Sequence, residues 1–166
     1  MSTTSETKAA GKPATGGTSH HDKFVIERTL NASPARVYAA WADPVAKARW
    51  FGGTPGQWEL LIRESDFRVG GRDRLKGVWP SGVTSDFICA YHDIVPERRI
   101  VYTYDMYMGD RHLSVSVATI EFEPAGTGTR MRVTEQGVYL DGQDDAASRE
   151  RGTRVLMDAL EASLRA

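Results

Sequence analysis

Residues 99–123, RIVYTYDMYMGDRHLSVSVATIEFE, alternate apolar or aromatic side chains with polar ones in two runs that are separated by Gly109-Asp110. This period-two alternation is typical of a β-strand with one buried face, and a short glycine-containing break between two such runs is typical of a tight turn. The segment therefore predicts a β-hairpin, with strands near 99–107 and 112–123.

The same pattern continues on both sides of this hairpin. Clusters of glycine, proline and polar residues, such as Gly70-Gly71 and Pro80-Ser81-Gly82, divide the chain at hairpin spacing. Because the connections are too short for a crossover helix, the strands should pair antiparallel. The other predicted strands are a first one from Phe24 to Asn31 and then 57–64, 72–79, 84–94 and 129–137.

Three helices complete the predicted fold. Ser33-Pro34 and Asp43-Pro44 each combine a capping side chain with a proline suited to the first helical turn, so two short helices should follow the first strand. Residues 144–164 lack proline and carry apolar side chains at helical spacing, namely Val155, Leu156, Ala159, Leu160 and Leu164. This pattern predicts an α+β domain in which a curved antiparallel sheet of seven strands wraps around a long C-terminal helix.

Composition narrows the classes of function. The chain has 166 residues with 21 basic and 22 acidic side chains, so it lacks the charge excess typical of nucleic-acid binding, and no apolar run is long enough for a membrane span. We therefore expect neither nucleic acid nor membrane as a partner. Cys89 is the single cysteine, which excludes an intrachain disulfide, fits a reducing cytoplasm and gives no thiolate metal cluster. No metal or other cofactor is predicted.

The first 22 residues are rich in Ser, Thr, Gly and Lys, and we interpret 1–22 as a disordered tail and 23–166 as the folded domain. Alternate side chains of the strands should face the long helix. Such aromatic side chains either fill a core or line a cavity of roughly 300–1,000 Å³. The candidate ligand-binding residues are Trp41, Trp50, Phe51, Trp58, Trp79, Phe87, Cys89, Tyr102, Tyr104, Met106, Met131, Val133, Glu135, Thr153 and Met157.

Glu135 is the most informative ionisable residue. It shares strand parity with Met131 and Val133, so its side chain should point towards the helix, where burial would raise its pKa. The alternative is a carboxylate at the rim that is paired with Arg149 or Arg154. No serine carries the glycine-flanked turn of a hydrolase, and no catalytic residue is assigned.

Five segments resemble one known family in order: NASPARVYAAW at 31–41, WFGG at 50–53, VGG at 69–71, GTR at 128–130 and TEQG at 134–137. They are similar to the bacterial branch of the START-like, or SRPBCC, superfamily and within it to the AHSA-type group, homologues of the activator of the heat-shock chaperone ATPase. The resemblance spans about residues 23–165. It implies a helix-grip fold with a cavity between sheet and C-terminal helix.

Members of that superfamily include ligand binders, polyketide cyclases and cochaperone domains, so the resemblance does not by itself select an activity. We favour a binding protein for a hydrophobic or aromatic small molecule. The alternatives are a cyclase- or hydratase-type enzyme, in which Glu135 abstracts a proton and Tyr102 or Tyr104 stabilises an oxyanion, and a cochaperone-like module with a chaperone partner, which is the least favoured. A homodimer through a sheet edge remains open.

Overall fold

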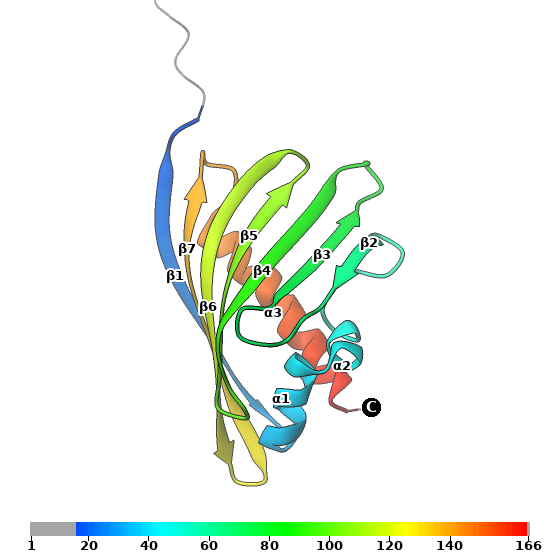
Figure 1. The fold of residues 1–166 in the computed structure, drawn as a ribbon, viewed down its shortest axis with the longest axis vertical. Helices are drawn as coiled ribbons and strands as arrows, with labels where there is room; N and C mark the ends of the chain where they lie inside the picture. The colour runs from blue at the N-terminus through cyan, green and yellow to red at the C-terminus, as the bar shows by residue number, and fades with distance from the viewer. Residues whose placement is uncertain (1–15, 166) are drawn as a thin grey trace, which may run out of the picture.

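The computed structural model describes residues 16–165 and has the order of elements that the sequence predicts. One strand is followed by two short helices, six strands and a long helix (Figure 1). The elements are β1 (Ser19–Leu30), α1 (Pro34–Ala42), α2 (Pro44–Ala48), β2 (Glu59–Glu64), β3 (Arg72–Val78), β4 (Thr84–Val95), β5 (Arg99–Met108), β6 (Arg111–Ala125), β7 (Gly128–Leu140) and α3 (Ala146–Ser163).

The seven strands form one antiparallel sheet in the order β1-β7-β6-β5-β4-β3-β2. Figure 1 shows the sheet curving around α3, with α1 and α2 beside the C-terminal end of that helix. Arg36 of α1 donates a 2.7 Å hydrogen bond to the carbonyl oxygen of Leu164, just after α3, and so joins these elements. The helix-grip architecture is confirmed.

Capping side chains fix where the helices begin. Ser33 accepts a hydrogen bond from the amide of Arg36, and Asp43 accepts one from the amide of Val45, each directly before a proline. Both caps satisfy backbone donors that have no partner within their own helix. Within residues 16–165, no helix combines the length and the apolar character that crossing a bilayer requires.

The core lies between the sheet and α3. We call the sheet surface that is turned towards α3 the inner face, and its opposite the outer face. Met157 and Leu160 of α3 are buried against the inner face, as the helical spacing predicts, but Val155 is 63% exposed. At about 100° per residue, position 155 lies roughly 200° around the helix from Met157. The prediction for Val155 is therefore wrong.

The first strand begins earlier than expected. Residues 19–22, which the sequence assigned to a disordered tail, are the first residues of β1 and pair with residues 137–140 of β7. Low hydrophobicity misled the assignment, because an exposed strand end gains its hydrogen bonds from a neighbour rather than from apolar burial. The rest of the predicted tail, residues 1–15, lies outside the described residues.

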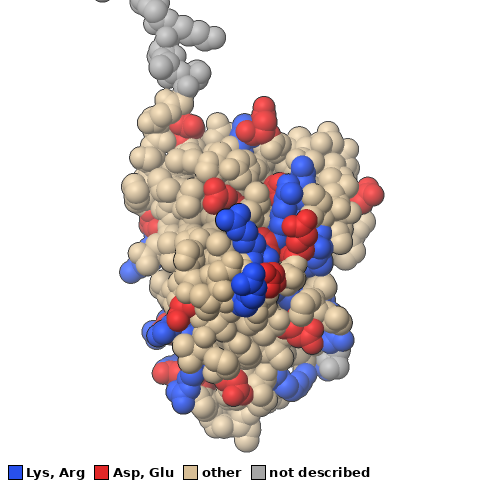
Figure 2. All heavy atoms as spheres, viewed as in Figure 1, with Lys and Arg blue, Asp and Glu red and all other residues tan. Residues whose placement is uncertain are grey.

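Ion pairs cover the outer face. Figure 2 shows acidic and basic side chains intermixed over the pictured face of the molecule. Arg132 contacts Glu27 at 2.7 Å and Arg99 contacts Asp93 at 2.6 Å, and both arginines are about half exposed. Exposed pairs of this kind stabilise a protein by about 0–1 kcal/mol each.

Candidate functional site

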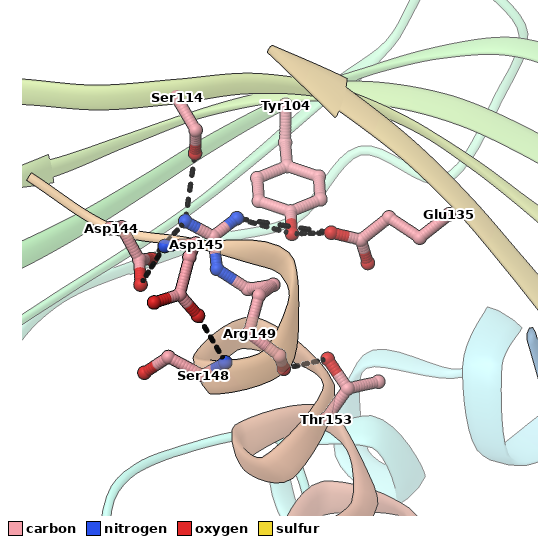
Figure 3. A network of polar contacts seen from close by, with 8 residues as sticks. All are labelled: Tyr104, Ser114, Glu135, Asp144, Asp145, Ser148, Arg149 and Thr153. Carbon is pink, nitrogen blue, oxygen red and sulfur yellow. Dashed lines mark hydrogen bonds and ion pairs between the residues drawn. The ribbon is translucent and has the colours of Figure 1, made fainter. Parts of the chain in front are cut away.

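A network of buried polar groups joins the inner face to the first turns of α3. Figure 3 shows Tyr104 of β5 and Glu135 of β7 reaching towards Arg149 of α3. The Tyr104 hydroxyl donates a hydrogen bond to Glu135 Oε1 and accepts one of 2.8 Å from Arg149 Nη1. Glu135 is only 4% exposed. The predicted inward orientation of Glu135 is thus what the structure shows.

Arg149 also holds the start of α3 in place. Its Nη2 donates hydrogen bonds to Ser114 Oγ at 2.7 Å and to Asp144 Oδ2 at 2.8 Å. The neighbouring Asp145 caps α3 by accepting a 2.7 Å hydrogen bond from the amide of Ser148 (Figure 3). One guanidinium therefore ties β5, β6 and the loop before α3 together.

Burial dominates the protonation of this network. It raises the pKa of Glu135 above its ordinary value, although the Tyr104 hydrogen bond and Arg149 oppose the rise. Burial alone would lower the pKa of Arg149, but Tyr104 and Glu135 raise it overall. Burial and Glu135 raise the pKa of Tyr104, so this phenol stays neutral.

Glu135 combines both readings that the sequence left open. It faces the helix, and Arg149 Nη1 lies 3.8 Å from its Oε1, whereas Arg154 pairs with Glu150 on the surface of α3. Tyr104 and Arg149 both lie against Oε1, so the other carboxyl oxygen, Oε2, is the atom of Glu135 that could act as a general base.

A second buried polar cluster joins α2 to β3 and β4. Lys47 Nζ lies 3.0 Å from Asp73 Oδ2 and 3.1 Å from the Tyr91 hydroxyl, which itself donates a 2.6 Å hydrogen bond to Asp73. The other carboxylate oxygen, Asp73 Oδ1, accepts a 3.0 Å hydrogen bond from the amide of Asp66. Lys47 is only 7% exposed and its ammonium lies 4.8 Å from the centre of the Phe51 ring. The cluster is fully paired.

The carboxylate of this cluster is held in its charged form. Burial alone would raise the pKa of Asp73, but the charge of Lys47 and the hydrogen bonds from Tyr91, Lys47 and the amide of Asp66 lower it below its ordinary value. Burial raises the pKa of Tyr91 far above the usual range of a phenol. Lys47 and Asp73 therefore form a buried ion pair that Tyr91 completes.

Cys89 lies next to this cluster on the inner face and should be unreactive. Burial raises the pKa of its thiol to about 11, so at pH 8 the thiolate fraction is about 100-fold smaller than at the ordinary value of 9.0. We expect a thiol-specific chromogenic disulfide reagent to label folded protein at least 100-fold more slowly than protein in denaturant. Fast labelling of the folded protein would contradict the buried position of Cys89.

Aromatic rings occupy the inner face between the two polar clusters. Phe51 contacts Phe87 with ring centroids 5.0 Å apart, and Phe87 lies 4.8 Å from Tyr104 and 6.4 Å from Tyr102. These distances and their mostly edge-on orientations fit favourable aromatic packing. The sequence correctly predicts that Phe87, Tyr102 and Tyr104 share one face of the sheet, and Phe51 contacts Phe87 from the segment after α2. We call Phe51, Phe87, Tyr102 and Tyr104 the aromatic row.

Tyr102 differs from its neighbours in the aromatic row. It stands on the inner face of the central strand and forms no side-chain hydrogen bond within residues 16–165. Its hydroxyl is not among the enclosed polar atoms that lack a partner, because part of the residue remains accessible. Burial, followed by the nearby Glu135, raises its pKa well above the ordinary value. A neutral phenol with an unused donor therefore faces the region between sheet and α3.

A cleft of about 290 Å³ opens beside α2 and reaches one end of the aromatic row. We call it the α2 cleft. No residue of α3 lines it, so this opening lies at the α2 end of the sheet and not between the sheet and α3, where the sequence placed the cavity. Its lining residues are Pro44, Lys47, Phe51, Arg63, Glu64, Ser65, Asp73, Arg74 and Leu75.

Several predicted wall residues pack in the core. Trp41 and Trp50 are buried with ring centroids 4.8 Å apart, and Trp50 Nε1 donates a 2.8 Å hydrogen bond to the carbonyl oxygen of Ala40. Met131, Val133 and Met157 are also fully buried. Met106 is partly buried against this core.

The remaining candidates lie near the margins of the inner face. The Trp58 ring covers Gly77, where an added Cβ would come within 1.9 Å of the indole, and Nε1 donates to Ser85 Oγ at 3.0 Å. Trp79 is partly exposed at the end of β3, and none of the aromatic contacts in the described chain involves it. Thr153 uses its hydroxyl to bond the carbonyl oxygen of Arg149 within α3.

Sequence reasoning missed several members of the polar clusters. Asp73 shares inner parity with Gly77 on β3, which was a usable signal. Arg149 was named only as one of two possible partners of Glu135, and its bonds to Tyr104, Ser114 and Asp144 were not predicted. Lys47 gave no such signal, because a lysine in a five-residue helix is usually exposed. No group of three or more His, Cys, Asp or Glu side chains suited to a metal ion occurs in the described part of the chain.

Comparisons with known proteins agree with this architecture. An uncharacterized protein from Rhizobium leguminosarum is 41% identical over 89% of this chain and 97% of its own, with a TM-score of 0.85. Mll3558 from Rhizobium loti is 40% identical over 89% of this chain and 100% of its own, with a TM-score of 0.83. CV1439 from Chromobacterium violaceum is 27% identical over 87% and 97% of the two chains, with a TM-score of 0.72.

No curated protein matches the chain. The family model described as "Activator of Hsp90 ATPase homolog 1-like protein" matches residues 31–165, which is most of the sequence. The chain therefore belongs to the family of Activator of Hsp90 ATPase homolog 1-like proteins.

Proposed function

We propose that this protein binds a small hydrophobic or aromatic molecule against the inner face of its sheet. The observation that carries the proposal is Tyr102, which belongs to the aromatic row, is partly accessible on the central strand and forms no side-chain hydrogen bond within the described chain. A phenol in such surroundings gains from a ligand that brings a hydrogen-bond acceptor. An apolar wall with a few unused polar groups is typical of small-molecule sites.

The route to this wall starts at the α2 cleft. Phe51 belongs both to the cleft and to the aromatic row, because its ring contacts Phe87, and Phe87 in turn contacts Tyr102. Phe51 and Phe87 thus join the cleft to Tyr102 through successive ring contacts. The two buried polar clusters flank this route and are internally paired, so they shape the site without competing for the ligand.

Catalysis is the second candidate, and the geometry favours it less. Glu135 faces the helix as an enzyme would require, but it accepts the Tyr104 hydrogen bond, and Tyr104 in turn accepts one from Arg149. These contacts hold Glu135 within a structural link between the sheet and α3, and the α2 cleft does not include it. We also place the function on the inner face and not on a chaperone-binding surface, because the shifted pKa values and the unused Tyr102 hydroxyl lie there.

A polarity-sensitive fluorophore tests the proposal. Prodan is neutral, aromatic and carries a carbonyl acceptor, and we expect its emission to shift to the blue and saturate on titration with the protein. Tyr102→Phe keeps the ring but removes the donor, and it should weaken binding about 2- to 10-fold, the range for one neutral hydrogen bond.

Tyr107→Phe is the matched control for that variant. Tyr107 lies on the same strand but stacks on His112, with ring centroids 4.5 Å apart, on the outer face. Its loss should leave binding unchanged. If Prodan showed no saturable shift, the binding proposal would be wrong, and equal effects of the two variants would remove Tyr102 from the site.

A further inference from the structure

The α2 cleft contains one cation that the protein itself does not neutralise. Lys47 is paired with Asp73, and Arg74 makes a two-point contact with Asp86 through bonds of 3.0 and 2.8 Å. Arg63, the third cation of the cleft, has no carboxylate oxygen within 4.0 Å among residues 16–165. Its charge is therefore the one left over at the inner end of the cleft.

Arg63 is held in place but only partly used. One of its amino groups donates a 2.8 Å hydrogen bond to the carbonyl oxygen of Phe51, which fixes the side chain of β2 against the segment after α2. A guanidinium carries five N–H donors in a rigid plane that matches the two oxygens of a carboxylate. Arg63 is partly buried, and burial lowers its pKa while the charge of Asp73 opposes the change.

Glu64 is the second carboxylate on the cleft wall, besides Asp73, and it forms no ion pair with Arg63. Its side chain is exposed, and its charge acts on the neighbouring Arg74. Successive residues of a strand point to opposite faces, which separates Glu64 from Arg63. An anion from outside the protein is therefore better placed to pair with Arg63 than Glu64 is.

The apolar residues that line the α2 cleft indicate which kind of anion would bind there. Phe51 and Leu75 supply apolar surface, and both pack against the hydrophobic core. A volume of about 290 Å³ lies at the lower end of the range for ligand pockets, so the ligand must be small. A ring and a carboxylate in one molecule would match the apolar wall and the unpaired guanidinium together.

We propose that the α2 cleft binds a small aromatic carboxylate, with its carboxylate on Arg63 and its ring against Phe51 and Leu75. This inference rests on the proposed function and narrows it from hydrophobic or aromatic molecules to aromatic acids. Arg63 is then the residue that selects the charged form of the ligand.

Two probes of nearly equal shape test whether the cleft prefers a charged ligand. 2-Naphthoate carries the charge and 2-naphthamide does not, and calorimetric titration of the full chain gives both affinities. We expect naphthoate to bind at least 10-fold more tightly. Its affinity should fall as sodium chloride is raised, whereas that of naphthamide should not, because only the anion forms an ion pair.

Variants test whether Arg63 causes the difference in affinity between naphthoate and naphthamide. Arg63→Gln should weaken naphthoate binding about 10- to 100-fold and leave naphthamide within about 2-fold, as expected for the loss of a charge-assisted pair. Arg132→Gln removes an equal charge from the outer face, where Arg132 pairs with Glu27 away from the cleft, and should change naphthoate binding less than about 3-fold. Thermal unfolding followed by circular dichroism checks that both variants fold.

The outcomes are distinct. If the amide bound as tightly as the acid at low and high salt, the charge preference would be wrong while the proposed function stood. If neither probe bound while Prodan still did, this inference would be wrong and the proposed function would stand; if Prodan also failed to bind, both would be wrong. Should Arg63→Gln fail to fold, the comparison of probes and salt in the wild-type chain still decides, and Arg63→Lys, which keeps the charge, should retain the preference for naphthoate.

Discussion

Replacing Arg149 with methionine is expected to lower the free energy of unfolding by about 3–5 kcal/mol. The substitution removes the cation that holds Tyr104, Ser114 and Asp144 and lies 3.8 Å from Glu135. Methionine fills a similar volume, so the loss comes mainly from polar groups that remain buried without a partner. Arg149 thus acts as a structural link between the sheet and α3.

Denaturant titration of the variant and two companions measures this effect. Arg154→Met removes an arginine of the same helix whose partner, Glu150, is on the surface, and we expect a loss below about 0.5 kcal/mol. The double variant Arg149→Met/Glu135→Gln should be more stable than Arg149→Met alone, because it also removes the carboxylate that has lost its counter-charge. A loss below about 1 kcal/mol in Arg149→Met would contradict the linking role.

The free energy of unfolding of Arg149→Met should change with pH in a direction that the pKa of Glu135 determines. Burial raises the pKa of Glu135 in the folded state above 4.5, so the folded state binds a proton more readily than the unfolded state between these two values. Stability from this group therefore increases as the pH falls from the raised pKa towards 4.5. The increase should be larger in Arg149→Met than in the wild type, since Arg149 opposes the rise of that pKa.

Replacing Lys47 with methionine should produce a loss of similar size, about 3–5 kcal/mol. The ammonium of Lys47 lies 3.0 Å from the buried carboxylate of Asp73, and Tyr91 and the Asp66 amide cannot replace its charge. Lys76→Met is the matched control, because Lys76 lies on the outer side of β3 and forms no ion pair within the described chain. We expect a change below about 0.5 kcal/mol for it.

Acid titration tests the same cluster through Asp73. Its folded pKa lies below the ordinary value of 3.8, so its ionised form stabilises the fold above that value, and this stabilisation is lost as the pH falls through the folded pKa. The stability difference between wild type and Asp73→Asn should therefore be constant near neutral pH and shrink below pH 3.8. A difference that stayed constant through this range would show that Asp73 does not contribute as an ion.

Features that depend on local sequence could be predicted, whereas contacts between distant parts of the chain could not. Alternation within residues 99–123 and proline-containing caps such as Ser33-Pro34 are local signals, and they predict the strands, helices and inner-face parity of Glu135 correctly. The contacts of Lys47, and those of Arg149 beyond the suggested pairing with Glu135, are determined by long-range packing. Lys47 contacts Asp73, which is 26 residues away in the chain, and Arg149 contacts Tyr104, which is 45 residues away. A local pattern contains no information about such contacts.

The opening of the site shows the same division. Strand parity correctly groups Phe87, Tyr102 and Tyr104, but how closely their rings approach depends on side-chain volumes and on where α2 ends. Parity alone therefore suggested a hollow beneath α3, whereas the α2 cleft lies beside α2 and is lined by Phe51 and Leu75. Predicting that shift requires the three-dimensional packing.

The most direct test of ligand binding at the inner face is a chemical-shift titration of methionine methyl groups with 2-naphthoate or Prodan. Met106 packs near the aromatic row and Met157 lies on the facing side of α3, while the valine methyls of Val115 and Val117 on the outer face serve as a reference. We predict saturable shifts at Met106, with Val115 and Val117 unchanged. Shifts confined to the outer valines, or no saturable shift at any methyl, would contradict a ligand site on the inner face.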